Sequence, residues 1–242
     1  MLNPSFLAVR AECSSSLVKI LAFFWIFVGF CATPALSTQP IEIDGKSYSI
    51  GLPQGLCEGS TTTWGIAYRT YLYDLGVAAD AKPSVISIFA DCGFVLSPKQ
   101  NGPPSAWGYI AYDNSVGKYW FGQKSLNKRM KREVEKLVLH EKIFSNLKEL
   151  TNSSLEKIKS TLSIGDIIQV GEPIQDQKGF LVSAVALIGS GKEAEEVYLS
   201  TVTFLRNRQI VTFAIYKRAD NKSNLDQVRS IAEKFLKSLS HD

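Results

Sequence analysis

Residue types that perform catalysis or hold metal ions are few in this chain and lie far apart. The chain has two histidines, His140 and His241, among its 242 residues. His140-Glu141 lacks the second histidine that the helical zinc-protease motif requires. No histidine, cysteine and carboxylate residues share the tight spacing of a metal site. The sequence therefore predicts no catalytic residue, no metal ion and no cofactor.

A basic run is the first candidate for binding chemistry. Five positive charges fall within nine residues, a density that could contact anionic lipid headgroups or another acidic polymer of the cell envelope. Positive charge near a helix N-terminus opposes the helix dipole, which favours a role in binding. The alternative is a solvated helix face with its charges paired to Glu133 and Glu135. The run begins at Lys124, and its predicted partner-binding residues are Lys128, Arg129, Lys131 and Arg132.

Aromatic side chains are the second candidate. One group, in residues 64–73, surrounds Arg69, and another spans residues 107–121. Aromatic rings with polar tips often anchor partners or ligands, and they are equally common in the cores of small sheets. We expect most of them to pack in the core. Trp120, in the glycine-flanked stretch 117–122, is the one that we predict to bind a partner.

The N-terminus of the chain indicates where the protein works. Residues 20–32 form an unbroken apolar run, Lys19 precedes it, and residues 33–37 bring a proline and then small side chains. This is the pattern of a secretory signal peptide. We expect cleavage after Ser37, with a cut after Ala35 as the second choice. The alternative is an uncleaved membrane anchor, because the apolar stretch approaches the length of a short membrane span.

Removal of this leader would leave two of the four cysteines, Cys57 and Cys92. An even pair in an oxidising compartment is typical of one disulfide. The alternative is a reactive thiol at Cys92. Asp91 beside it would raise the pKa of that thiol, and neither cysteine belongs to a Cys-x-x-Cys pair. The sequence therefore favours a Cys57–Cys92 disulfide.

The first half of the remaining chain alternates strand, turn and helix signals. Asp44-Gly45 separates two short apolar segments and predicts a hairpin, because glycine accepts a positive φ. Residues 65–75 favour a helix, and residues 85–89 and 107–112 are typical of strands.

Residues 124–163 are predicted to form a helical insertion. Apolar residues recur at three-, four- and seven-residue steps over residues 126–147, the spacing of one helix face. A Ser-x-x-Glu capping box opens a second helix over residues 153–162. Gly165-Asp166 is expected to end it.

The last third carries the strongest fold signal. Residues 180–188 are nearly all apolar, as expected of a strand buried on both faces. Residues 196–205 and 209–217 form a hairpin around Asn207, and residues 225–239 make an amphipathic helix. Three antiparallel strands followed by a helix packed across them is an α+β plan.

This order of elements resembles the Mog1/PsbP-like fold, including its small bacterial exported members. The matching features are the segment Tyr48–Pro53, YSIGLP, and the stretch 201–239. Members of that fold are mostly binding or assembly factors, so the resemblance implies binding rather than catalysis. None of the family's functional residues transfers to this chain, and the basic helix 124–150 has no counterpart there.

The sequence as a whole predicts an exported non-enzymatic binding or assembly domain of the cell envelope, periplasmic or secreted. A signal peptide over residues 1–37 precedes a single α+β domain over residues 38–242, whose antiparallel sheet ends in a three-strand meander packed by helices. The net charge of +4 is too small to indicate nucleic acid. The expected partner is an envelope protein or an anionic envelope component. The alternatives are a small exported hydrolase with an unrecognised site, and a membrane-anchored structural module that retains its N-terminal helix.

Overall fold

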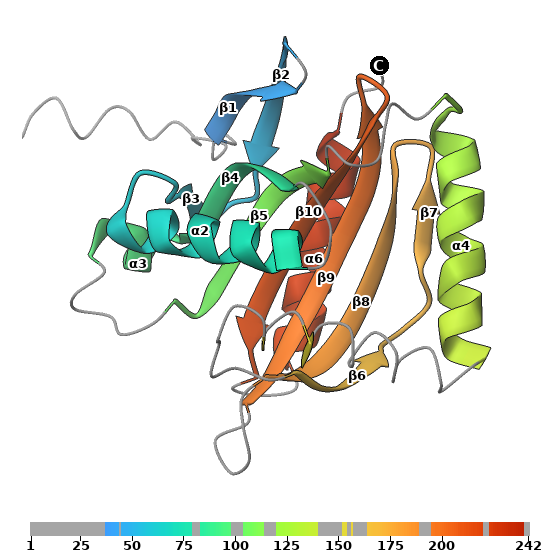
Figure 1. Ribbon diagram of the computed structural model, residues 1–242. Helices are drawn as coiled ribbons and strands as arrows, with labels where there is room; N and C mark the ends of the chain where they lie inside the picture. The colour runs from blue at the N-terminus through green and yellow to red at the C-terminus, as the bar shows by residue number, and fades with distance from the viewer. Residues whose placement is uncertain are drawn as a thin grey trace, which may run out of the picture. The chain divides into compact units, whose positions relative to one another are not determined.

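Figure 1 shows the protein as a computed structural model. The residues that the structure describes are 37–43, 45–78, 83–97, 104–113, 120–139, 152–153, 156, 164–188, 195–219 and 223–239. They belong to one unit of the chain, Leu36–Asp242. The predicted leader over residues 1–37 lies outside them except for its last residue, so the signal peptide and the domain boundary stay predictions.

An antiparallel sheet of eight strands is the largest part of this unit. The strand order is β3-β4-β5-β10-β9-β8-β6, and β7 pairs with β8 beyond the end of β6. The predicted meander is confirmed, because β8, β9 and β10 pair in succession. The fold class is therefore the predicted α+β. The strands are β3 (Leu56–Glu58), β4 (Pro83–Asp91), β5 (Ala106–Asp113), β6 (Ile164–Gln169), β7 (Ile174–Asp176), β8 (Gly179–Ile188), β9 (Glu195–Arg206) and β10 (Gln209–Arg218).

A separate two-stranded sheet consists of β1 (Ser37–Ile43) and β2 (Lys46–Leu52). It is the hairpin predicted around Asp44-Gly45, and Gly45 has the positive φ, 74°, that such a turn uses. Ile43, Ile50 and Leu52 are buried in the same core as the large sheet. The hairpin is therefore packed on the sheet and is not a free arm.

Three strands, β3, β6 and β7, are absent from the sequence prediction. The prediction that Gly165-Asp166 ends a helix is wrong, because both residues lie inside β6. A Cβ atom at Gly165 would lie 2.7 Å from the Cβ of Leu187 in β8. Glycine at this position therefore lets two strands approach closely and does not mark a helix end.

Helices lie against both faces of the sheet. In Figure 1, α6 (Ser223–Ser238) lies behind the sheet, where it contacts β8, β9 and β10. On the front, α2 (Thr63–Ala78) contacts β4. The short α3 (Cys92–Leu96) follows β4 directly, and α4 (Gln123–Leu139) contacts β8 and β9.

The predicted helices are confirmed over α2, α6 and the first part of the insertion. Within the predicted insertion 124–163, residues 124–139 belong to α4. Asn152, Ser153 and Glu156 are also helical. The remaining residues of the insertion lie outside those that the structure describes.

The core is centred on a stack of phenylalanine rings. The ring of Phe213 in β10 lies 3.9 Å from that of Phe235 in α6 and 5.1 Å from that of Phe89 in β4, measured between centroids. Phe89 lies opposite Gly108 of β5, where a Cβ atom would be 2.5 Å from the Phe89 ring. Glycine in the middle of β5 therefore makes room for this ring. Alternate residues of β10 follow the same face, and Phe213 and Ile215 are fully buried.

The predicted disulfide is present. It joins Cys57 in β3 to Cys92 at the start of α3, with the two Cα atoms 4.8 Å apart. The carboxylate of Asp91 caps α3, because it accepts a hydrogen bond from the backbone N–H of Phe94, at 2.9 Å. It also accepts one from the backbone N–H of Ser105, at 2.9 Å. Both the Cys92 sulfur and the neighbouring Asp91 carboxylate thus have structural partners.

Removal of the disulfide is expected to destabilise the domain. The bond closes a loop of 35 residues, and replacing both cysteines by alanine should lower the free energy of unfolding by about 4 kcal/mol on the chain-entropy account. Chemical denaturation of the double variant and of the reduced native protein measures this. The two should unfold at similar denaturant concentrations, and an unfolding midpoint equal to that of the oxidised protein would contradict the prediction.

Candidate binding surface

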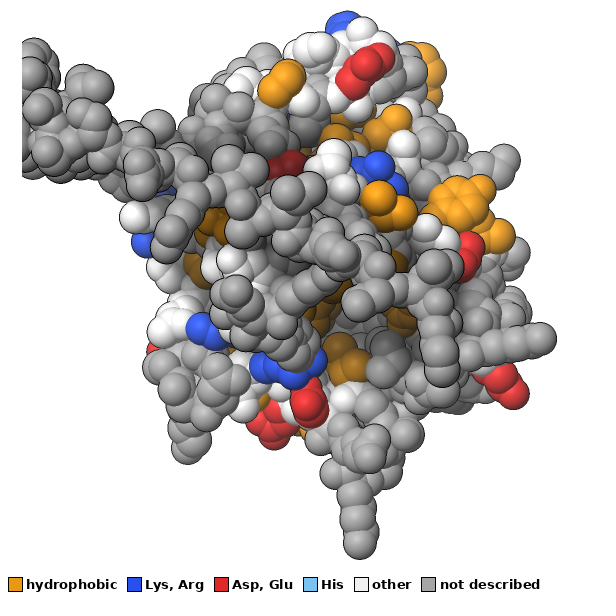
Figure 2. Space-filling model, turned by 90° about the vertical axis from the view of Figure 1, so that its left-hand side faces the viewer, with side chains coloured by type: hydrophobic (Ala, Val, Ile, Leu, Met, Phe, Trp, Pro, Cys, Tyr) orange, Lys and Arg blue, Asp and Glu red, His pale blue; other side chains and the backbone are white. Residues whose placement is uncertain are grey.

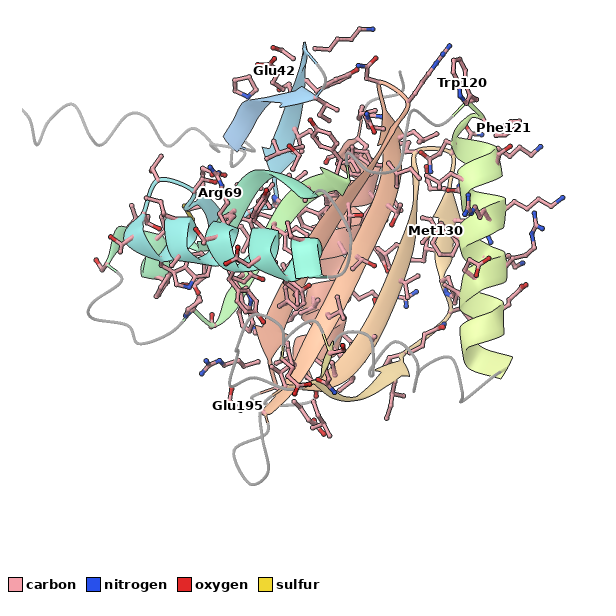
Figure 3. The ribbon with its side chains drawn as sticks, in the orientation of Figure 1. Glu42, Arg69, Trp120, Phe121, Met130 and Glu195 are labelled. Carbon is pink, nitrogen blue, oxygen red and sulfur yellow. A yellow bond between two sulfur atoms is a disulfide. The ribbon has the colours of Figure 1, made fainter. Side chains whose placement is uncertain are left out.

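The predicted binding residues gather where α4 begins. This is the end of the sheet that carries the β1–β2, β7–β8 and β9–β10 turns (Figure 1). Trp120 is 77% exposed and Phe121 is 67% exposed. Figure 3 shows both side chains at the start of α4, outside the sheet. Trp120 is therefore a surface residue, and its role in binding stays a prediction.

Arg208 lies over Trp120. Its guanidinium carbon is 5.0 Å from the centroid of the indole ring, within the range of a cation–π contact. Asn207 and Arg208 form the β9–β10 turn with φ values of 48° and 63°, as a type I′ turn requires. For an L-residue such as arginine this left-handed conformation costs about 1–2 kcal/mol. Sequence reasoning missed Arg208, although the hairpin predicted around Asn207 put it at the tip of the turn.

The basic residues of α4 line two separate hollows. Lys128, Arg129 and Arg132 line a shallow depression of about 360 Å³ together with Phe121, Ser125 and Glu133. Lys131 instead pairs with Glu135, one turn further along the helix, at 3.8 Å. Lys131 lines a separate hollow that includes Gln169 and Glu172. The structure thus brings three of the four predicted basic residues together and leaves Lys131 apart.

A further hollow adjoins Arg208. It measures about 610 Å³, and it is lined by the β1–β2 residues Lys46, Ser47 and Tyr48 and by Asn207 and Arg208. Arg208 therefore links this hollow to Trp120. We call the exposed cations and rings at this end of the sheet the aromatic–basic surface. It consists of Lys46, Trp120, Phe121, Lys128, Arg129, Arg132 and Arg208.

Two amides hold the start of α4 against the sheet. The Gln123 side chain donates to Oδ1 of Asn127, at 2.8 Å, and accepts from the backbone N–H of Leu205, at 2.7 Å. The Asn127 side chain in turn donates to the backbone carbonyl of Asp176, at 2.6 Å. Leu126, only 1% exposed, packs beside them. These contacts position Trp120 and Phe121 next to the β9–β10 turn.

Several of the other aromatic residues pack within the fold. The rings of Trp64 and Tyr68 stack at 5.3 Å between centroids, and those of Trp107 and Tyr216 at 5.8 Å. Burial raises the pKa of the Tyr68, Tyr109 and Tyr216 hydroxyls, and Tyr109 and Tyr216 also hydrogen-bond to each other. These hydroxyls therefore stay protonated at neutral pH. Their role is packing, as predicted for most of the aromatic residues.

The described residues hold no group of three or more histidine, cysteine, aspartate and glutamate side chains that could bind a metal ion. Within the same ranges, no helix has both the length and the apolar character needed to cross a membrane.

Charge on the α2 side of the molecule is mixed. Figure 2 views this side, and it shows Lys and Arg side chains interspersed with Asp and Glu, with hydrophobic side chains between them. Ile66, Tyr73 and Val77 of α2 are among the exposed hydrophobic residues. This face therefore differs from the aromatic–basic surface, whose described charges are mainly positive.

Comparisons with known proteins assign no family to the chain. No protein-family model matches it, and no curated protein does. Among solved structures, the chain is similar to the solution structure of cyanobacterial PsbP (CyanoP) from Synechocystis sp. PCC 6803, with a TM-score of 0.37 and 10% identity over 87% of this chain and 96% of that chain. The match is to a protein of the family that the order of elements in the sequence resembles. It assigns no function and no site residue to this chain.

The hydrogen bonds of Asn127 predict that a substitution outside the aromatic–basic surface can loosen the start of α4. Asn127→Ala leaves the Gln123 amide and the Asp176 carbonyl without their partner, which should lower the free energy of unfolding by about 1–3 kcal/mol. The backbone N–H of Leu205 should also exchange faster with deuterium, because Gln123 loses its support. Ser125→Ala, on the exposed side of the same helix turn, is the matched control. Equal unfolding and equal exchange in the two variants would count against this role of Asn127.

Proposed function

We propose that the protein is an exported, non-enzymatic domain that binds a negatively charged partner in the cell envelope through its aromatic–basic surface. The observation that carries the proposal is the adjacent exposed pair Trp120 and Phe121, 77% and 67% exposed, at the start of a cationic helix face. Large rings left in water next to one another are typical of an interaction site. Tryptophan and arginine are also the residues that most often dominate binding energy.

The charges around the rings support an anionic partner. Arg208 covers one side of Trp120, and Lys128, Arg129 and Arg132 continue the positive charge along α4. The structure describes no ion pair for these three residues of α4, whereas Lys131 pairs with Glu135. Glu133 is the carboxylate that lines the same depression. The excess of positive charge favours an acidic or phosphate-bearing surface.

Two features support the location. The N-terminal apolar run followed by proline and small residues is typical of a secretory leader. The Cys57–Cys92 disulfide is of the kind that persists in an oxidising compartment such as the periplasm.

The binding role predicts that exposed residues inside and outside the aromatic–basic surface differ in their effect on binding. Trp120→Ala should weaken binding of the protein to isolated envelope membranes by roughly 30-fold, since a central tryptophan contributes about 2 kcal/mol or more. The double variant with Lys128→Ala and Arg132→Ala should also weaken this binding. Leu96→Ala, at a side chain that is equally exposed, and Lys131→Ala should leave it unchanged. Co-sedimentation over a range of protein concentrations measures the affinity, and equal affinity of all these variants would refute the proposed site.

The location predicts the mass of the protein in the cell. Protein recovered from the envelope fraction should begin at Thr38, and it should be lighter than its reduced form by two hydrogen atoms. Intact-mass spectrometry before and after reduction tests both points. The full-length mass would instead mean that the leader is retained as an anchor.

A further inference from the structure

We infer that the partner of the aromatic–basic surface is the headgroup layer of an anionic lipid bilayer, into which Trp120 and Phe121 insert. This inference rests on the proposed function and narrows it from any acidic partner to a lipid surface. Trp120 and Phe121 protrude together at the point where the chain enters α4 (Figure 3). Tryptophan prefers the boundary between hydrocarbon and water, because its ring is largely apolar and its N–H remains hydrogen-bonded.

The arrangement of the cations suits a broad surface. They come from three separate segments, namely the β1–β2 turn, the β9–β10 turn and α4, which meet at one end of the sheet (Figure 1). Each cation near an anionic bilayer adds to the attraction, so charges spread around two inserted rings act together. The two depressions on this surface are shallow and separate, unlike a single groove that would hold one acidic peptide.

One of these depressions has the chemistry of a headgroup site. The hollow of about 610 Å³ is lined by Lys46, Ser47, Tyr48, Asn207 and Arg208. Three of these residues carry an ammonium, a hydroxyl and a guanidinium group. These groups are hydrogen-bond donors that suit phosphate oxygens. Arg208 also contacts Trp120, so a phosphate held in the hollow would lie beside the inserted ring. The carboxylate of Glu42, in the same hairpin as Lys46, opposes this attraction in part.

The conformation of Arg208 provides a variant that separates binding from folding. Arg208 has a φ of 63°, where glycine is free of strain. Arg208→Gly therefore removes the guanidinium and relieves the backbone, so the variant should unfold at or above the temperature of the native protein. Loss of binding in this variant is not explained by loss of the fold.

The test uses vesicles of phosphatidylcholine alone and vesicles in which a third of the lipid is phosphatidylglycerol. We expect the full chain to bind the anionic vesicles more tightly than the neutral ones, with an affinity that falls as salt is raised. Arg208→Gly and the pair Lys128→Ala with Arg132→Ala should each weaken only the anionic-lipid component, the pair by roughly 30-fold. Lys131→Ala and Leu96→Ala are the matched controls. The apolar N-terminal run is the same in every variant, so differences between variants report on the surface.

Insertion of Trp120 into the bilayer is measured separately, by fluorescence quenching. Lipids brominated near the headgroup should quench tryptophan fluorescence in the native protein, and Trp120→Phe should remove part of that quenching.

Three outcomes are distinguishable. Anionic-lipid binding that depends on these residues supports the inference. Binding to isolated envelope membranes that depends on them, without vesicle binding, overturns the inference and leaves the proposed function with an acidic protein or polymer as partner. If neither vesicle binding nor binding to envelope membranes depends on these residues, both the inference and the proposed function are overturned.

Discussion

The stack of Phe89, Phe213 and Phe235 is the contact on which the rest of the structure depends. It joins β4 to β10 and α6, which follow much later in the sequence, and each ring buries enough apolar surface to contribute a few kcal/mol. The stack exists because Gly108 in the intervening strand leaves space for the Phe89 ring. Since β10 pairs with both β5 and β9, holding Phe213 in place holds the middle of the sheet and the turn at the end of β9 and β10.

The aromatic–basic surface is a consequence of that frame. Gln123 and Asn127 attach α4 to backbone groups of Leu205 and Asp176, which lie next to the turns at the same end of the sheet. The contacts to the sheet use backbone atoms, so they specify where α4 begins without requiring particular side chains on the strands. Trp120 is thereby held beside the β9–β10 turn and meets Arg208 there, although 88 residues separate them in the chain. The sheet thus holds in place the exposed Trp120 and the strained backbone of Arg208.

Elements with a strong local signal were predictable, and those that depend on a neighbour were not. The β1–β2 hairpin follows from Asp44-Gly45, and α6 follows from its apolar spacing, because turn conformation and helix faces are local properties. In contrast, β6 is short and contains Gly165, which on local grounds ends a helix. Its strand conformation comes from pairing with β8, against which Gly165 packs. Pairing of this kind is invisible until the partner strand is known.

The sequence by itself determined the α+β plan, the meander with its closing helix, the pairing of Cys57 with Cys92, and the candidacy of Trp120 and the basic run. These follow from periodicity, turn chemistry and cysteine count, which act within short stretches or on the whole chain at once. Only the tertiary structure decided that Lys131 lines a different hollow from Lys128, Arg129 and Arg132, and that Arg208 completes the surface. The reason is that the partners of a side chain depend on which elements the core brings together, and the spacing of residues along one helix does not contain that information.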